Sequence, residues 1–313
     1  MRAVVLKQGL SFTTDWPEPT TRTDEAIITP TLTGICKTDL ELVKGYMGFQ
    51  GVLGHEFVGV VSHCEDPSWV GRRVVGEINC APPGLDCPDP RHLPGRSVLG
   101  ILARDGVMAD HFSVPLANLL PVPDALPDHL AVFTEPLAAA YQILEQLSQL
   151  PANALVLGDG KLGSLCALAL AEQGCAVTLV GKHLDKLDKV AGRVQTVLHK
   201  DLEQLPSDFP LVVEATGSPS GLPEALARVR PRGTIVLKTT VAAPHQADLS
   251  PIVINELSVL GSRCGRFAPA LQALAEHRID PSLLIEETFP LEHALEAFRQ
   301  AERRGAGKIL LRH

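Results

Sequence analysis

Four side chains that could bind a metal ion lie far apart in the sequence. They are a thiol, an imidazole and two carboxylates: Cys36, His55, Glu56 and Glu135. Cys36 follows an apolar run, and His55 and Glu56 begin the run HEFVGVV. Taken singly, each has an ordinary structural interpretation, since a lone histidine is usually structural and Glu135 could interact with the N-terminus of a helix. The residue types alone leave the metal site and this alternative open.

A glycine-rich segment, GDGKLG, offers a site for a phosphate group. It follows the apolar run ALVL and opens the helix-like run KLGSLCALALAEQG, and this context makes the match to G-x-G-x-x-G specific. Gly158 permits the tight turn, Gly160 lets the backbone approach a pyrophosphate, and Gly163 permits close helix–strand packing. The first helical residues, Lys161 and Leu162, supply N–H groups for the anion. The segment predicts a dinucleotide site, with a plain strand–helix turn as the alternative.

The residues after the next apolar run, VTLV, bear on the choice of cofactor. The end of this strand normally carries a carboxylate that binds the ribose 2′-hydroxyl of NAD. Here it holds Gly181, followed by Lys182 and His183. Because a carboxylate would repel a 2′-phosphate and Lys182 would attract it, the sequence favours NADP over NAD. Alternatively, Lys182 is a solvated residue at the start of a helix.

The apolar runs predict two kinds of architecture. Residues 1–130 contain short β-like runs separated by turn residues, as in an antiparallel β domain. Strands then alternate with helices, which implies a parallel sheet with helices on both faces. The expected strands are 3–6, 26–32, 57–62, 73–78, 154–157, 177–180, 211–214, 234–237 and 308–311. The expected helices are 130–150, 161–172, 184–191, 219–229, 269–276 and 291–303.

The composition excludes several classes of protein. The chain has 313 residues and a net charge of −8, so it lacks the basic surface of a nucleic-acid-binding protein. Its apolar runs are far shorter than the ~20 residues of a membrane span, and the start, MRAVVLKQG, has no stretch typical of a signal peptide. Seven cysteines, an odd number, argue against a disulfide framework. We expect a cytoplasmic protein of about two domains that binds neither nucleic acid nor membranes.

Five motifs together give the chain a resemblance to a known family. They are GICKTD, GHEFVG, TEPLA, GDGKLG and EATG, which begin at residues 34, 54, 134, 158 and 214. In their order and spacing the chain resembles the zinc-containing medium-chain dehydrogenases/reductases, the alcohol and polyol dehydrogenase superfamily, over nearly its whole length. It is most similar to the sorbitol- and glucose-dehydrogenase-like branch, because that branch places an acidic ligand at the position of Glu135.

The resemblance implies a fold and a reaction. The fold is α/β, with a GroES-like β-rich catalytic domain (residues 1–136 and 265–313) and a doubly wound Rossmann cofactor domain (residues 137–264). The reaction is a zinc-dependent transfer of hydride between an alcohol, polyol or sugar hydroxyl and NAD(P). The expected partner is therefore a small alcohol or carbonyl compound, and the resemblance also implies a homo-oligomer.

The resemblance further implies that Cys36, His55 and either Glu56 or Glu135 bind one catalytic zinc, directly or through water. Thiolate, imidazole and carboxylate suit a tetrahedral Zn²⁺, and three protein ligands leave one position open for the substrate. One thiolate and one carboxylate neutralise the dication, whereas a second carboxylate would make the ion a weaker Lewis acid. We therefore expect Glu56 and Glu135 to exchange with water rather than to bind together.

A second, structural zinc is expected to be absent. Many relatives hold one with four cysteines in a loop, but the corresponding proline-rich loop, residues 79–96, contains only Cys80 and Cys87. Two thiolates cannot close a tetrahedral site. We expect a single zinc ion per chain.

The resemblance assigns roles to further residues. Thr38 would pass the hydroxyl proton of the substrate toward the cofactor ribose, unless it is only a helix N-cap. Asp39 would orient a metal-bound imidazole, unless it is only an acid at a helix start. Thr216 and Gly217 would lie at the edge of the cofactor. Lys308 would reach the pyrophosphate, unless it is an ordinary lysine at a strand edge.

Two other functions compete with the zinc dehydrogenase. One is a zinc-free quinone or enone reductase on the same scaffold, although such relatives usually lack the cysteine and histidine–glutamate ligands. The other is a non-catalytic dinucleotide-binding redox sensor, which would need no proton path and hence no Thr38.

Overall fold

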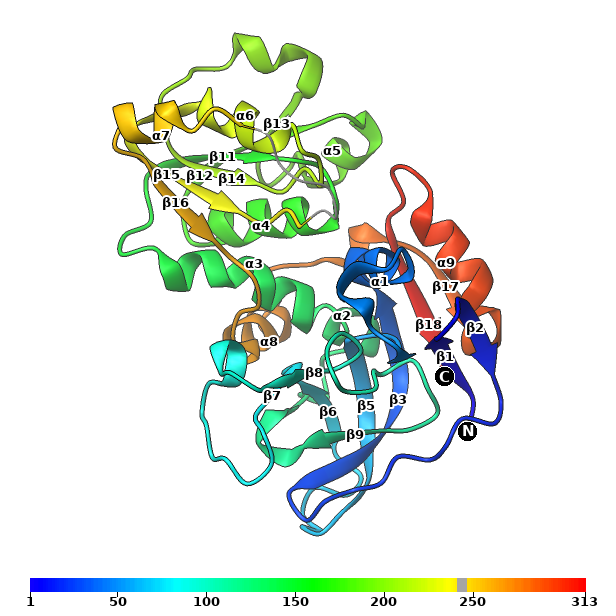
Figure 1. Ribbon diagram of the computed structural model, residues 1–313. Helices are drawn as coiled ribbons and strands as arrows, with labels where there is room; N and C mark the ends of the chain where they lie inside the picture. The colour runs from blue at the N-terminus through cyan, green and yellow to red at the C-terminus, as the bar shows by residue number, and fades with distance from the viewer. Residues whose placement is uncertain (241–246) are drawn as a thin grey trace. The chain divides into compact units, whose positions relative to one another are not determined.

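The computed structural model describes residues 1–240 and 247–313. The chain divides into two compact units. Unit 1 comprises Met1–Glu135 and Phe267–His313, and unit 2 comprises Pro136–Arg266. Strands dominate unit 1, whereas strands and helices alternate along unit 2 (Figure 1). The α/β fold class predicted from the sequence is confirmed.

A seven-stranded sheet forms the centre of unit 1, in the order β10-β6-β5-β3-β18-β17 with β9 also pairing with β3. Its central strand, β3, is antiparallel to both β5 and β18, so the red strand lies beside the blue one in Figure 1. The N-terminal and C-terminal parts of the chain therefore contribute neighbouring strands to this sheet. The strands are β3 (Glu25–Ile35), β5 (Glu56–Cys64), β6 (Arg73–Gly76), β9 (Phe112–Pro115), β10 (Leu119–Pro121), β17 (Ile285–Pro290) and β18 (Lys308–Arg312).

Shorter elements surround this sheet. A buried apolar cluster that includes Ile35, Leu42, Phe298 and Ile309 joins β3 and β18 to two helices. The helices of unit 1 are α1 (Lys37–Val43), α2 (Asp128–Ala131), α8 (Phe267–Ala275) and α9 (Ala294–Glu302). Its small sheets consist of β1 (Ala3–Leu6), β2 (Leu10–Thr13) and β4 (Gly51–Val52), and of β7 (Asn79–Cys80) and β8 (Ser97–Val98).

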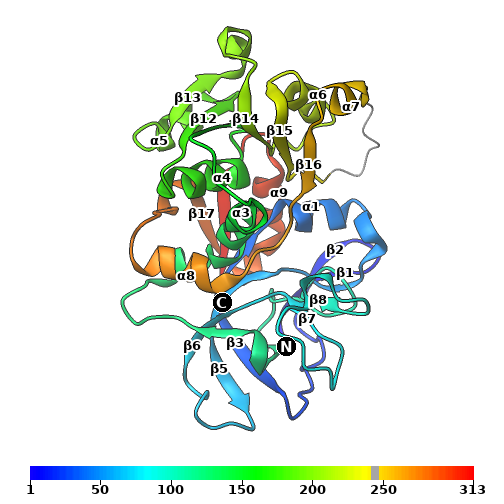
Figure 2. The same cartoon turned by 90° about the vertical axis from the view of Figure 1, so that its left-hand side faces the viewer.

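Unit 2 contains a parallel six-stranded sheet in the order β13-β12-β11-β14-β15-β16. The order reverses between β11 and β14, which makes the carboxyl ends of these two strands the expected place for a ligand. Figure 2 shows the sheet with its helices from a second direction. The strands are β11 (Asn153–Leu157), β12 (Ala176–Gly181), β13 (Gln195–Leu198), β14 (Phe209–Glu214), β15 (Val229–Leu237) and β16 (Ser258–Gly261). The helices are α3 (Thr134–Gln146), which starts at the end of the first segment of unit 1, α4 (Lys161–Glu172), α5 (Leu184–Val190), α6 (Gly221–Leu226) and α7 (Ser250–Ile254).

Three sequence-based element predictions need correction. The helix expected at 130–150 is two helices, α2 and α3, because Pro136 has no N–H and is tolerated only in the first turn of a helix. The helix expected at 219–229 is only α6, and its last residues belong to β15. Nine strands were not expected, because most of them are short or partly exposed and carry little apolar signal; they are β2, β4, β7, β8, β9, β10, β13, β16 and β17.

Two other expectations can be compared with the described residues. All seven cysteines are free, as expected, and Cys166 and Cys175 are buried. No helix in the ranges 1–240 and 247–313 is both long and apolar enough to cross a membrane.

Candidate active site

Three candidate metal ligands of unit 1 converge although they are distant in sequence. The ligand atoms of Cys36, His55 and Glu56 lie within 4.8 Å of one another, and no other such group occurs among the described residues. Cys36 stands between β3 and α1, while His55 precedes β5 and Glu56 begins it. The register of β3 on β5 pairs Gly34 with Glu56. A Cβ atom on Gly34 would collide with the Glu56 carboxylate, so the glycine of GICKTD leaves room for this acid.

Asp39 fixes the positions of two of these candidate ligands. It is fully buried, and its Oδ2 accepts a hydrogen bond of 2.8 Å from the backbone N–H of Cys36. Its Oδ1 lies 3.3 Å from His55 Nδ1 and accepts a hydrogen bond from the backbone N–H of Gly54. Asp39 is thus an acid in the first turn of α1 and lies beside the imidazole, although His55 Nδ1 makes no hydrogen bond within the described residues. That Asp39 orients a metal-bound imidazole stays a prediction.

Thr38 is the second residue of α1 and not its N-cap, which is Cys36. The N-cap alternative for Thr38 is therefore wrong. Its hydroxyl oxygen lies 3.8 Å from the sulfur of Cys36. The hydroxyl thus stands next to the candidate metal site.

Lys308 and Glu56 form a buried ion pair. Their side chains are 2% and 0% exposed, and Lys308 Nζ donates a hydrogen bond to Glu56 Oε2. Because β18 lies between β3 and β17, the alternative of a lysine at a strand edge is wrong. The structure places the Lys308 ammonium at the metal-site candidates, and its contact with a pyrophosphate stays a prediction.

The charges and the burial of this cluster shift the pKa values of Glu135 and His55. Burial raises the pKa of Glu135 to about 7; His55 and Lys308 oppose this rise, whereas Glu56 and Asp39 add to it. Burial lowers the pKa of His55, but Asp39 and Cys36 outweigh it and raise that pKa well above its ordinary value. Glu135 lies outside the group of three ligand atoms.

A buried oxygen of Glu56 is consistent with the binding of a cation at this cluster. Glu56 Oε1 has no hydrogen-bond donor among the described residues, although Oε2 accepts from Lys308. A buried acceptor without a donor is costly unless a cation or an ordered water lies beside it. Together with a thiol and an imidazole, this oxygen fits the ligand chemistry of Zn²⁺.

The glycine-rich turn of unit 2 has the geometry that a pyrophosphate requires. Gly158 has φ +114°, and a Cβ atom there would collide with the carbonyl oxygen of Ala215. A Cβ atom on Gly163, in the first turn of α4, would collide with the carbonyl oxygen of Gly158. By contrast, a Cβ atom on Gly160 would meet nothing within 4 Å. The backbone at Gly160 therefore faces open space at the start of α4, where Lys161 and Leu162 lie.

Comparison with known proteins identifies the family. Residues 22–124 match the model of the alcohol dehydrogenase GroES-like domain. The chain is 30% identical to glucose 1-dehydrogenase of Thermoproteus tenax over 340 residues, which covers 95% of this chain and 96% of that protein. The chain belongs to the zinc-containing medium-chain dehydrogenases/reductases. It is accordingly an oxidoreductase, with a GroES-like unit and a Rossmann unit.

Solved structures agree with this assignment. The dehydrogenase RspB of Escherichia coli CFT073, solved with NADH, is 26% identical to this chain, has a TM-score of 0.88 and is matched over 100% of this chain and 99% of its own. A zinc-binding dehydrogenase of Sinorhizobium meliloti, solved with NADP, has a TM-score of 0.87 with 100% and 99% coverage. At 23% identity the second likeness shows the fold alone.

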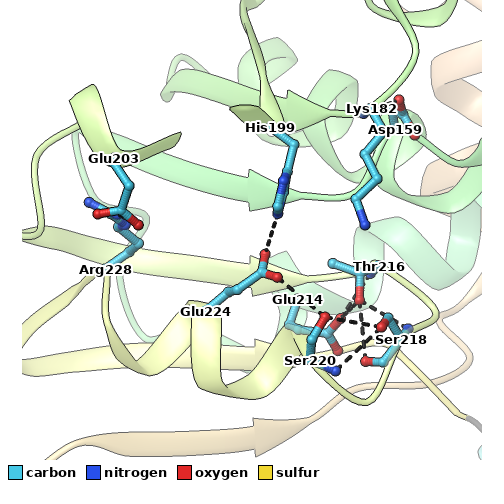
Figure 3. Close-up of polar contacts among 10 residues, drawn as sticks. All are labelled: Asp159, Lys182, His199, Glu203, Glu214, Thr216, Ser218, Ser220, Glu224 and Arg228. Atoms are coloured by element: carbon cyan, nitrogen blue, oxygen red, sulfur yellow. Dashed lines mark hydrogen bonds and ion pairs between the residues drawn. The ribbon is translucent and has the colours of Figure 1, made fainter. Parts of the chain in front are cut away.

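Sequence reasoning assigned no role to Glu214 of this dehydrogenase. This buried acid ends β14, and its Oε1 accepts hydrogen bonds from Thr216 N at 2.8 Å and Thr216 Oγ1 at 2.6 Å (Figure 3). The same oxygen accepts a hydrogen bond of 2.8 Å from Thr239 Oγ1. The N–H of Gly217, which has φ +66°, donates to Thr239 Oγ1. Glu214 thus ties together the turns after β14 and β15. The acid that ends the apolar run LVVE was the available signal.

Asp159 was also missed as a functional residue. It is the second residue of GDGKLG, and its Oδ2 accepts hydrogen bonds of 2.7 Å from the backbone N–H groups of both Lys182 and His183. The Lys182 ammonium makes no ion pair or hydrogen bond with the described residues, and in Figure 3 it extends toward Thr216. The turn after Gly181, which was predicted to bind the cofactor, therefore also contains the carboxylate of Asp159, which comes from the glycine-rich segment GDGKLG.

The loop at 79–96 is anchored in unit 1 rather than irregular and exposed throughout. Arg91 is 3% exposed and pairs with Asp89 at 2.7 Å. Cys80 is fully buried, burial raises the pKa of its thiol to about 11, and Asn118 Nδ2 donates to its sulfur. Cys87 is half-buried. The polar contacts of Arg91 and Asn118 thus hold part of this proline-rich loop against the rest of unit 1.

Proposed function

We propose that this dehydrogenase oxidises or forms an alcohol, polyol or sugar hydroxyl in a zinc-dependent reaction with NAD(P). The observation that carries the proposal is the convergence of Cys36, His55 and Glu56 around a buried oxygen that lacks a donor. The identity to a glucose 1-dehydrogenase supports a hydroxyl substrate of the polyol or sugar class. The expected exchange of Glu56 and Glu135 as ligands is part of the proposal.

The residues of unit 1 would have different roles at such a site. Cys36, His55 and Glu56 or Glu135 would hold the ion, which as a Lewis acid lowers the pKa of a bound hydroxyl. Asp39, whose Oδ1 lies 3.3 Å from His55 Nδ1, would orient the imidazole ring when His55 binds the ion. Thr38 would accept the hydroxyl proton in a hydrogen bond and pass it on. Lys308 keeps a positive charge against Glu56.

NADP is the proposed preferred cofactor. Gly181 brings no carboxylate of its own to the end of β12, and the Lys182 ammonium is unpaired within the described residues, so it is available to a 2′-phosphate. We propose that the turns at Gly158–Gly163 and at Thr216 and Gly217 bind this cofactor. One relative was solved with NADH, which shows that the family's scaffold also takes the dinucleotide without the phosphate.

The assembly and location are further parts of the proposal. A homo-oligomer is supported by Val253 and Ile254 of α7, which are 78% and 77% exposed, in the unit whose described sheet ends at β16. Light scattering should then give a mass above that of one chain, and Val253→Asp should reduce it. A cytoplasmic location is supported by the seven free cysteines.

The test is turnover of a panel of alcohols, polyols and sugars with NADP and NAD, before and after chelation. We expect activity that a chelator removes and added Zn²⁺ restores, and that Cys36→Ser abolishes. The buried Cys166→Ala serves as the matched control and should retain activity. Reduction of quinones or enones without zinc would instead identify the zinc-free reductase, and cofactor binding without any turnover would identify a sensor.

A further inference from the structure

A carboxylate lies at the end of β12 although the strand itself ends in glycine. A Cβ atom on Gly181 would stand 2.6 Å from the carboxyl carbon of Asp159. The Asp159 side chain thus fills the space where a side chain at position 181 would begin. In many Rossmann units an acid at the end of this strand binds the ribose 2′-hydroxyl. Here the strand end has no acid, and the glycine-rich segment places the Asp159 carboxylate beside it.

The contacts of Asp159 hold this carboxylate in place. Its side chain is 9% exposed. Its Oδ2 accepts from the N–H groups of Lys182 and His183 at 2.7 Å, and His183 Nδ1 lies 3.0 Å from the same oxygen. These are the donors of the turn after β12, so the carboxylate has already engaged hydrogen-bond groups that a 2′-phosphate would need.

The turn after β12 also carries the positive charge of Lys182. The Lys182 ammonium has no ion pair within the described ranges and, in Figure 3, extends away from Asp159 toward Thr216. A 2′-phosphate here would be attracted by Lys182 and repelled by Asp159. The two charges would therefore act on this group in opposite directions.

We propose that Asp159 is a specificity-determining residue that opposes the 2′-phosphate and thereby keeps NAD in use beside NADP. The inference rests on the proposed cofactor role of unit 2 and adds to it. Its consequence is an enzyme whose affinities for the two dinucleotides differ by no more than about tenfold, since neither charge acts alone.

Fluorescence titration of the purified chain with NADPH and NADH gives the dissociation constants that test this. In Asp159→Asn, which keeps the size of the side chain and removes its charge, NADPH should gain roughly tenfold in affinity relative to NADH. Asp185→Asn, on the exposed side of α5, is the matched control and should leave this ratio unchanged. Lys182→Met should shift the ratio about tenfold toward NADH.

Two results for Asp159→Asn would overturn the proposal. One is a shift of the ratio toward NADH. The other is an unchanged ratio, including an equal loss of both affinities, which would mean that Asp159 only shapes the turn. If Asp159→Asn does not fold, the wild-type ratio decides, and a preference above about tenfold for either cofactor contradicts the proposal. A wild-type chain that binds neither dinucleotide would instead refute the proposed function.

Discussion

Lys308 donates a hydrogen bond to Glu56 across 252 positions of sequence, and both side chains are buried. Removal of one partner from such a pair leaves an uncompensated buried charge. We expect Lys308→Met to lower the free energy of unfolding of the zinc-free protein by about 3 to 5 kcal/mol. Urea denaturation in the presence of a chelator measures this.

A double variant separates the charge from the packing. Lys308→Met combined with Glu56→Gln removes both charges, so it should regain much of the lost stability, and Lys308→Arg should lose little. If Lys308→Met unfolds at the same urea concentration as the wild type, the pair contributes nothing to stability.

The zinc content should be about one ion per chain, because the described residues offer a single group of close ligands. Elemental analysis of the purified protein measures it. Cys36→Ser and His55→Gln should bring the content close to zero, whereas Cys80→Ala, which removes a buried thiol outside this group, should not change it. Two ions per chain, or loss of zinc in Cys80→Ala, would contradict the prediction.

Thr38 should affect the chemical step more than substrate binding, because its hydroxyl stands beside the sulfur of Cys36. Proton transfer by a positioned side chain contributes roughly 10²- to 10⁴-fold to rate. We expect Thr38→Ala to lower kcat by about 10²-fold with a small change in KM, and Thr38→Ser to restore most of the rate. Steady-state kinetics with unchanged zinc content checks this, and an Ala variant as fast as the Ser variant would exclude the relay.

Acid stability should depend on His313, whose pKa burial lowers to about 4. The unfolded chain takes up this proton near pH 6.5, so below that pH the unfolded state binds more protons than the folded one. The free energy of unfolding should therefore fall as the pH drops from about 6.5 to about 4 and should not respond to this group above it.

His313→Gln tests this dependence. The variant can still bond to Thr33 Oγ1, which lies 3.1 Å from His313 Nε2, and its urea midpoint should decline less between pH 6.5 and 4. His63→Gln, at an exposed histidine, should follow the wild type. Parallel curves for His313→Gln and the wild type would show that His313 stays neutral in both states or titrates equally in both.

Local patterns in the sequence predicted most of the fold. The segment GDGKLG lies between β11 and α4 as expected, because a turn, an apolar strand and a helix are encoded within neighbouring residues. The break before Thr134 was missed, and so were nine strands, among them β9, β10 and β17 of unit 1 and the edge strands β13 and β16 of unit 2. Pro136 ends the helix that precedes it, because proline is tolerated only in the first turn of a helix. Short and edge strands bury too little apolar surface to give a clear alternation of apolar and polar residues in the sequence.

The candidate site was less accessible to sequence reasoning. Cys36, His55 and Glu56 were grouped through resemblance to a family, since no spacing rule brings residues of β3 and β5 together. The contacts of Lys308 and Asp159 depend on the register of strands and on the path of a turn. Such long-range pairings emerge only from the packed structure.

The pairing of β18 with β3 has a consequence for biosynthesis. In a nascent chain β3 and β5 leave the ribosome well before β18, so Cys36, His55 and Glu56 emerge while residues 32–35 of β3 still lack β18 as a neighbour. All strands of unit 2 are translated before β18. The ammonium that pairs with Glu56 comes only with β18, so the candidate metal site lacks this buried positive charge until β18 has been translated.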